Sequence, residues 1–339
     1  MQHILDNIWE IADLSPFQCL LWLSELVGRH KTINNWVVRT LSTWAETYLL
    51  AHDNQRVRSA ACSLFVNLVP SCQFQGAWKA WRVGHSPNRD LIPNMTPEAV
   101  AVTQTIFRSL LRLMPKAKKF AEPSAHSANK LVQYFSMLTF CLLTKAEKLA
   151  FSEYFKEFWN LFYPEMCQSK IQQHLNKQAL LVFWYHACQD CPENVAHIYR
   201  NKEVSQKLPF NYIMVDNDDQ ELVAFNKLTL PAYYGLLRLA SQQNRFFLKT
   251  LSTHENMEWA FKNIAAHSSI YVNAAEELFL MMEIFAEKPP TPPPGASIAS
   301  IENHKEEQIR ASTFRKNTLA TFLNSYQKGQ WQTLITVSV

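Results

Sequence analysis

The sequence predicts an all-α fold, built as an array of antiparallel helix pairs. Apolar residues recur at helical spacing along most of the chain, and the turns between the apolar stripes are short, so successive helices are expected to pack antiparallel. Glycine is scarce, with 6 in 339 residues, whereas all-β folds and phosphate-binding loops use more of it. Hydrophobic residues make up 47% of the chain, which is enough to form a large core.

Three stretches carry the clearest helical stripes. Apolar residues step by 4, 3 and 4 positions between residues 37 and 48, and again between residues 57 and 68. Six aromatic residues between positions 151 and 162 follow the spacing i, i+3, i+4, i+7, i+8, i+11, which predicts one helix with an aromatic face. Such faces must pack against other helices. The tryptophans on these and similar stripes are therefore expected in the core: Trp44, Trp159 and Trp184.

Prolines mark the expected ends of helices. A proline in the first turn of a helix is well tolerated, because its missing N–H would have no partner there. The predicted starts are Ser15-Pro16, Thr96-Pro97 and Cys191-Pro192. Later in a helix a proline removes a hydrogen bond and favours termination. The predicted stops are Pro70, Pro115 and Pro164.

The chain is expected to divide into three parts. Residues 1–286 form the helical-repeat region, and residues 287–300, EKPPTPPPGASIAS, form a proline-rich linker or loop that favours extended polyproline II. A PxxP spacing is present, but no flanking arginine supports binding to an SH3 domain. Residues 301–339 resume helical character and end in an apolar stretch, from which we expect the fold to continue further.

Residues 52–68, HDNQRVRSAACSLFVNL, resemble the second helix of a HEAT-type repeat. The resemblance rests on Asp53, a Val57-Arg58 pair and the small residue Ala60. In such repeats the acidic and basic side chains link neighbouring units by charge-assisted hydrogen bonds. Asp53 and Arg58 are therefore predicted to have a structural role in an α-solenoid, although no strict repeat period is visible.

Residues 184–199, WYHACQDCPENVAHIY, contain the one cysteine spacing that could indicate a zinc or redox site. On a helix His186 and Cys188 point in different directions, as do Cys191 and His197, so four zinc ligands do not converge. A structural corner between two helices is the preferred interpretation. The segment Asp190-Cys191-Pro192-Glu193 is predicted to form a capping box, with Asp190 as the N-cap of the second helix and Glu193 reaching back to it.

Charge and composition exclude several classes of function. A net charge of +4 is too small to indicate a nucleic-acid surface, and the short basic run at Lys116–Lys119 is typical of a solvated helix end. No apolar run reaches the roughly 20 residues that span a bilayer, and no signal peptide is apparent. The seven cysteines lie mostly in apolar runs, which is typical of a reduced cytoplasmic or nuclear protein. No cofactor, metal or small-molecule ligand is expected.

Motifs for catalysis are not found either. The sequence has no Walker loop, GxGxxG, GxSxG or HExxH motif. The acidic run Asp216–Asp219 lacks the glycine of a calcium-binding loop and is better explained as a helix cap or a solvated turn.

Several long stretches, in the same order, resemble the helical region of the very large ubiquitin-specific proteases, the group that includes the 9X, 24 and 34 members. They are residues 53–71, 176–194, 230–239, 255–264, 274–285 and 331–335. The resemblance implies an armadillo/HEAT-like region that lies after the catalytic domain. It also implies a parent protein of the cysteine-type deubiquitinase class, with ubiquitinated substrates or regulators as partners.

The catalytic boxes of that family are not found in this chain. The family's cysteine follows a glycine- and asparagine-rich turn, and its histidine follows a glycine near a tyrosine. None of the cysteines has such a turn before it, and Gly84-His85, the one Gly-His pair, is followed by Ser86-Pro87. No catalytic residue is therefore carried over to this sequence.

Three hypotheses follow. The first is a non-catalytic helical scaffold that docks substrates or regulators beside a ubiquitin-cleaving domain. The second is a stand-alone helical-repeat adaptor with no enzyme attached, and the third is a thiol enzyme that uses Cys188 or Cys191. The first agrees best with the resemblance and with the absence of catalytic motifs.

Overall fold

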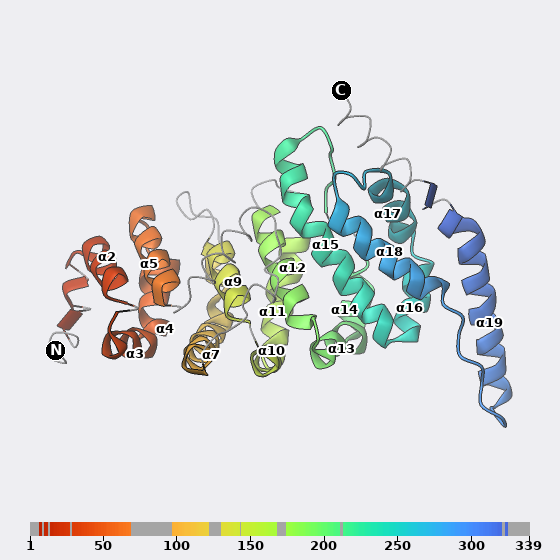
Figure 1. The fold of residues 1–339 in the computed structure, drawn as a ribbon, viewed down its shortest axis with the longest axis horizontal. Helices are drawn as coiled ribbons and strands as arrows, with labels where there is room; N and C mark the ends of the chain where they lie inside the picture. Colours follow the sequence, from red (N-terminus) through yellow and green to blue (C-terminus); the bar gives the residue numbers. More distant parts are fainter. Residues whose placement is uncertain are drawn as a thin grey trace. The chain divides into compact units, whose positions relative to one another are not determined.

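The all-α prediction is confirmed by a computed structural model of the chain (Figure 1). The structure describes residues 7–8, 10–12, 14–27, 29–68, 97–121, 130–142, 144–167, 174–210, 213–320 and 323–324. These residues form helices joined by turns and loops, with no strand among them. None of the described helices is both long enough and apolar enough to cross a membrane. The chain divides into two compact units, residues 1–187 and residues 188–339.

Unit 1 begins with a helical turn and α2 (Pro16–Leu26), which packs against α5 (Gln55–Leu68). Between them lie α3 (Lys31–Arg39), α4 (Leu41–Trp44) and the π-helix η1 (Ala45–Ala51). The predicted start at Ser15-Pro16 is confirmed, because Ser15 is the N-cap of α2 and Pro16 its first residue. Trp44 is fully buried, and its Nε1 donates to Val37 O at 3.0 Å.

The middle of unit 1 is a series of shorter helices. They are α7 (Pro97–Leu111), η3 (Met114–Lys116), α8 (Lys118–Ala121), α9 (Lys130–Cys141), α10 (Lys145–Ser152), α11 (Phe155–Met166) and α12 (His174–Cys188). The predicted start at Pro97 is confirmed, and Pro115 lies in η3, beyond the end of α7. Pro70 lies outside the described residues. The predicted stop at Pro164 is wrong, because α11 continues to Met166, although the missing N–H falls in the last turn of the helix.

The prediction of one aromatic helix over residues 151–162 is also wrong. α10 ends at Ser152, and Tyr154 N–H bonds to Phe151 O in a turn before α11 starts. The rings nevertheless gather in one core, since those of α9, α10 and α11 meet those of α12. Phe151 and Phe183 have ring centroids 4.9 Å apart, as do Phe162 and Trp184. Trp159 and Trp184 are both buried, which confirms them as core residues.

Unit 2 is organised around its longest helix, α15 (Gln220–Gln243), which packs against α13 (Pro192–Arg200), α16 (Arg245–Ser252) and α18 (Val272–Ala286). Asp219 caps α15 by accepting from Glu221 N–H and Leu222 N–H, so the acidic run is a helix cap as expected. A half-buried ion pair between Arg238 and Glu277 joins α15 to α18.

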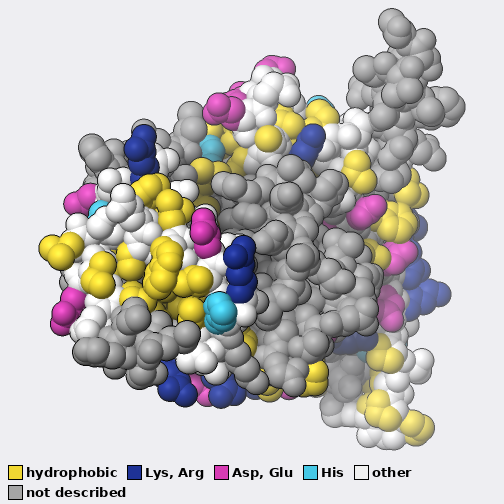
Figure 2. All heavy atoms as spheres, turned by 60° about the vertical axis from the view of Figure 1, so that its left-hand side comes forward, with side chains coloured by type: hydrophobic (Ala, Val, Ile, Leu, Met, Phe, Trp, Pro, Cys, Tyr) yellow, Lys and Arg dark blue, Asp and Glu magenta, His cyan; other side chains and the backbone are white. Residues whose placement is uncertain are grey.

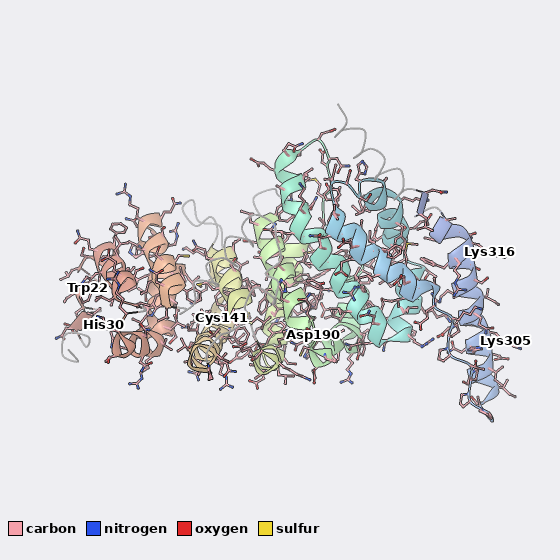
Figure 3. All side chains as sticks on the ribbon, viewed as in Figure 1. Trp22, His30, Cys141, Asp190, Lys305 and Lys316 are labelled. Carbon is pink, nitrogen blue, oxygen red and sulfur yellow. The ribbon has the colours of Figure 1, made fainter. Side chains whose placement is uncertain are left out.

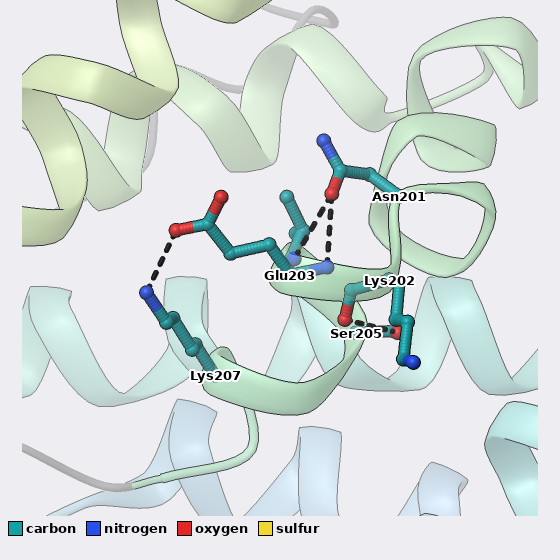
Figure 4. Close-up of polar contacts among 6 residues, drawn as sticks. Asn201, Lys202, Glu203, Ser205 and Lys207 are labelled. Carbon is teal, nitrogen blue, oxygen red and sulfur yellow. Dashed lines mark hydrogen bonds and ion pairs between the residues drawn. The ribbon is translucent and has the colours of Figure 1, made fainter.

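The short helix α14 (Lys202–Lys207) illustrates how local chemistry sets a helix boundary (Figure 4). The Asn201 side chain accepts from Glu203 N–H at 3.0 Å and Val204 N–H at 3.3 Å. Glu203 and Lys207 then form an ion pair of 2.7 Å one turn apart. The two bonds to Asn201 satisfy backbone N–H groups that have no partner within the helix itself.

The C-terminal part of unit 2 contains α17 (Glu255–Ala266), α19 (Ile298–Phe314) and the π-helix η5 (Arg315–Leu319). α19 buries few residues, mainly Ala311 and Phe314, and Phe314 packs edge-on against Phe261 and Phe285. Residues 287–297 are not helical, and α19 begins three residues before the predicted boundary at 301. Residues 325–339 lie outside the described part of the chain.

Candidate functional site

An exposed apolar surface lies at the N-terminal end of unit 1, on α2 and the helical turn before it. Figure 2 shows hydrophobic side chains gathered on this end, with charged side chains at the edge of the cluster. Five large apolar residues form it, and we call them the α2 outer face. Ile11, Leu14, Phe17, Leu21 and Trp22 are 53%, 89%, 38%, 39% and 47% exposed, respectively.

The α2 outer face is opposite the side of the helix that enters the core. At 100° per residue, Phe17, Leu21 and Trp22 span an arc of about 140°. Cys19, Leu20, Leu23 and Ser24 occupy another arc and are buried where α2 packs against α5. Trp22, labelled in Figure 3, therefore belongs to a helix that is apolar on both sides, of which one side faces solvent.

Hydrogen bonds hold α2 firmly on α5. Asn67 Nδ2 of α5 donates to Ser24 O at 3.0 Å and to Ser24 Oγ at 2.8 Å. Cys19 Sγ lies 3.8 Å from Ile8 O, which joins α2 to the turn before it. The α2 outer face therefore lies on a helix whose opposite side is held against α5 by packing and hydrogen bonds.

Exposed charges of both signs border this face. Glu10 and Glu25 are exposed, as are Arg29 and His30, and His30 is labelled in Figure 3. Soluble monomers seldom expose a contiguous apolar patch of several large side chains, and such patches usually mark interaction sites. An apolar centre with a charged rim is the usual composition of a protein–protein interface. Sequence reasoning missed this site, although residues 16–26 are apolar around most of the helix.

The CxxC segment forms a corner between α12 and α13. Cys188 is the last residue of α12, and the side chains of Cys188 and Cys191 are both buried. The prediction of Asp190 as N-cap is wrong: the N-cap of α13 is Cys191, whose side chain makes no capping hydrogen bond. Asp190 instead adopts a left-handed conformation with φ of 51°, which turns the chain and leaves Cys191 in the non-helical position.

The predicted capping box at this corner is therefore not formed. Glu193 is the second residue of α13, one position too early to fill the role of the third residue. Its carboxylate accepts from the Cys191 thiol, with Sγ and Oε2 3.5 Å apart. The described residues contain no group of three or more histidine, cysteine or acidic side chains placed to hold a metal ion.

Other buried thiols have raised pKa values. Burial raises the pKa of Cys19, and burial followed by the charge of Glu147 raises that of Cys141 well above the usual range. The thiolate is the nucleophilic form of cysteine. These two sites are therefore suited to core packing and unsuited to nucleophilic chemistry.

Arg58 has a structural role, but not through the predicted partner group. Its buried guanidinium donates to His52 O at 2.7 Å and to Asp53 O at 2.8 Å, which are main-chain carbonyls just after η1. The Asp53 side chain is exposed. The prediction that the Asp53 carboxylate pairs with Arg58 to join neighbouring helix pairs is thus wrong, because the contact is local and uses the backbone of Asp53.

A buried polar cluster between α11 and α12 was not predicted. Asn176 Nδ2 donates to Glu165 Oε2 at 3.1 Å. Burial raises the pKa of Glu165, and the hydrogen bond from Asn176 and the charge of Lys177 partly oppose this effect. Burial lowers the pKa of Lys177, while Cys167 and Glu165 oppose that shift. The charges of Glu165 and Lys177 thus each oppose the pKa shift that burial causes in the other group. This mutual stabilisation favours a structural role for the pair.

Comparison with known proteins identifies relatives of a single kind. Ubiquitin carboxyl-terminal hydrolase 34 from Homo sapiens is 41% identical over 335 residues, which cover 98% of this chain and 9% of the human protein. The protein of that name from Mus musculus gives the same identity and coverage. Ubiquitin carboxyl-terminal hydrolase puf from Drosophila melanogaster is 38% identical over 341 residues, which cover 98% of this chain and 8% of the fly protein.

No protein-family profile and no solved structure matches the chain. The chain spans less than a tenth of the length of the relatives it matches. The match nevertheless covers nearly all of the chain at substantial identity, so the expected resemblance to the very large ubiquitin-specific proteases is confirmed.

Proposed function

We propose that this chain, which is homologous to one region of large ubiquitin-specific proteases, is a non-catalytic helical scaffold that docks ubiquitinated substrates or regulators for a deubiquitinase. The observation that carries this proposal is the α2 outer face. Its apolar centre and charged rim are suited to an apolar stripe on a partner protein, such as one side of an amphipathic helix. An armadillo/HEAT-like stacking of helix pairs is part of the same proposal.

Buried cysteines support a docking role over thiol chemistry. Cys188 and Cys191 are each 1% exposed, so a ubiquitin C-terminus could reach neither sulfur without local opening of the corner. The ordinary cysteine usage of the chain also supports an intracellular setting for the protein.

The test uses the full-length enzyme with charges introduced into the α2 outer face. Leu14→Lys combined with Trp22→Lys places two charges where we expect an apolar partner. The double variant should lose activity toward conjugated protein substrates. Its kcat/KM should fall by about 10-fold or more, which corresponds to the loss of one or two central contacts. Activity toward ubiquitin carrying only a small C-terminal fluorophore should not change, since that substrate offers no docking partner.

Phe246→Lys is the matched control, because Phe246 is also a large apolar side chain, 80% exposed, and lies on α16 in unit 2. Unchanged kcat/KM for both kinds of substrate in the double variant would contradict the proposal. A loss of stability of the enzyme, with equal loss of activity toward both substrates, would show that this face packs against the enzyme itself and would also contradict it.

A further inference from the structure

A loop without helical structure joins α18 to α19 (Figure 1). It contains a threonine in a setting suited to covalent modification. Residues 287–293 have no regular secondary structure, and Thr291 lies near their centre with its side chain exposed. The surrounding residues are Lys288-Pro-Pro-Thr-Pro-Pro-Pro294. Each proline holds φ near −65° and lacks an N–H, so the stretch favours an extended polyproline II backbone.

We propose that Thr291 is a phosphorylation site for a proline-directed serine/threonine kinase. Protein kinases bind the acceptor residue in an extended conformation, and a proline-directed kinase requires proline directly after it. Pro292 meets that requirement, and its missing N–H means that no donor is left unpaired in the apolar pocket of such an enzyme. The preformed extended backbone also reduces the entropy lost on binding.

The dipeptide alone does not identify the site, because Ser15-Pro16, Ser86-Pro87 and Thr96-Pro97 have the same form. Of these three acceptors, Ser15 is the one that lies among the described residues. Ser15 is the N-cap of α2, and Pro16 already belongs to the helix. Ser15 Oγ donates to Gln18 Oε1 at 3.2 Å, and Ser15 N–H donates to Ile11 O at 3.0 Å. A kinase could extend the backbone around Ser15 only by unwinding the start of α2. The structure therefore distinguishes Thr291 from Ser15.

Access to Thr291 requires little disruption of the fold. Pro289 is buried and Pro292 is half-buried, so the segment is anchored on one side, while Pro290, Thr291 and Pro293 are exposed. Releasing this short anchor is a local opening that leaves α18 and α19 formed. By contrast, α19 is held separately, through ion pairs such as Lys249–Glu306 and through the burial of Phe314.

The reaction transfers the γ-phosphoryl group of Mg·ATP to Thr291 Oγ1. The bond between the γ-phosphorus and the bridging oxygen of ADP breaks, a new P–O bond forms to Oγ1, and the hydroxyl proton passes to the catalytic base of the kinase. The product gains a charge of about −1.5 to −2 at pH 7. Glu287 and Lys288 balance one another, so the modification would change this segment from neutral to strongly acidic.

The test incubates the full 339-residue chain with Mg·ATP and a purified kinase of the MAP kinase type, and then maps phosphate by peptide mass spectrometry. We expect the initial rate at Thr291 to exceed that at Ser15 by at least about 10-fold, because extending the chain at Ser15 breaks the bond from its N–H to Ile11 O and unwinds the start of α2. A 10-fold difference in rate corresponds to about 1.4 kcal/mol. Thr291→Ala should abolish phosphorylation of the peptide that contains residue 291, and Thr291→Ser should restore it.

Two synthetic peptides, residues 11–19 and 287–295, serve as matched controls because neither carries the tertiary structure. Comparable rates on the two peptides, together with selectivity for Thr291 in the folded chain, would support the proposal. It would be overturned by equal rates at Ser15 and Thr291 in the folded chain. An unmodified Thr291, whether in the chain alone or in the peptide as well, would equally overturn it.

Discussion

Replacing Trp44 and Trp184 separately by phenylalanine separates the contribution of an indole N–H from that of ring packing. Both side chains are fully buried in unit 1, so both variants remove a similar volume and report on the same unit. Trp44 Nε1 donates to Val37 O at 3.0 Å. Trp184 Nε1 is buried in the aromatic core, where no hydrogen-bond partner for it exists among the described residues.

The expected difference between the variants follows from these contacts. Trp44→Phe loses a hydrogen bond with a net contribution of about 1 kcal/mol. Trp184→Phe removes a buried unpaired donor, whose desolvation destabilises the fold by about 1–3 kcal/mol. Since the packing loss is common to both, the free energy of unfolding should fall by about 2–4 kcal/mol more in Trp44→Phe than in Trp184→Phe.

The assay is urea unfolding followed by far-UV circular dichroism, with the slope against urea checked for each variant. Trp44→Ala and Trp184→Ala are controls that remove the whole ring, and each should lower the free energy of unfolding by about 3–5 kcal/mol. Equal losses in the two phenylalanine variants would refute the reasoning, because they would show that the Trp184 N–H is satisfied in solution, for example by a buried water molecule.

Two further pairs of variants test single contacts in the same assay. Arg58→Met should lower the free energy of unfolding by about 2–3 kcal/mol, because the buried guanidinium donates hydrogen bonds to two main-chain carbonyls. Asp53→Ala should change it by under about 0.5 kcal/mol, because Arg58 bonds to the main chain of Asp53 and not to its side chain. Equal losses in the two variants would contradict this contact. Tyr233→Phe should lower the free energy of unfolding by about 1 kcal/mol, because it removes the hydrogen bond from the Tyr233 hydroxyl to Leu208 O. Tyr234→Phe should be neutral or stabilising, since the buried hydroxyl of Tyr234 has no partner among the described residues. Burial raises the pKa of Tyr234, so the stability linked to its neutral form is fully present below the unfolded pKa of about 10 and is lost as the pH rises above it. The original chain should therefore lose more stability between pH 8 and pH 10.5 than Tyr234→Phe does, and identical losses would mean that Tyr234 titrates normally.

Much of the helical layout could be predicted because its signals are local. The starts at Pro16, Pro97 and Pro192 were predicted correctly, since a proline in the first turn acts through its own backbone. The burial of the three tryptophans was also predictable from stripes of apolar residues three and four positions apart. The resemblance to large ubiquitin-specific proteases followed from long stretches of matching sequence and did not depend on the fold.

The exact boundaries and partners were less predictable, because they depend on where the chain turns. The turn at Tyr154 divided a continuous aromatic stripe into two helices. The left-handed conformation of Asp190 moved the N-cap to Cys191, one residue later than expected. Arg58 bonds to the main-chain carbonyls of His52 and Asp53 and not to the Asp53 carboxylate, because the buried guanidinium lies next to the chain that leaves η1.

The helical fold, the aromatic core and the relation to large ubiquitin-specific proteases could all be recognised from the amino-acid sequence. These properties follow from local spacing and from identity along the chain, both of which can be read without coordinates. The packing of helices was needed to show which apolar side of α2 is buried against α5 and which side remains exposed. The tertiary structure also placed Thr291 in a segment without regular secondary structure and Ser15 at the N-cap position of α2. The physical reason is that solvent exposure depends on what packs against a residue from elsewhere in the chain, whereas helix formation depends mainly on its neighbours in sequence.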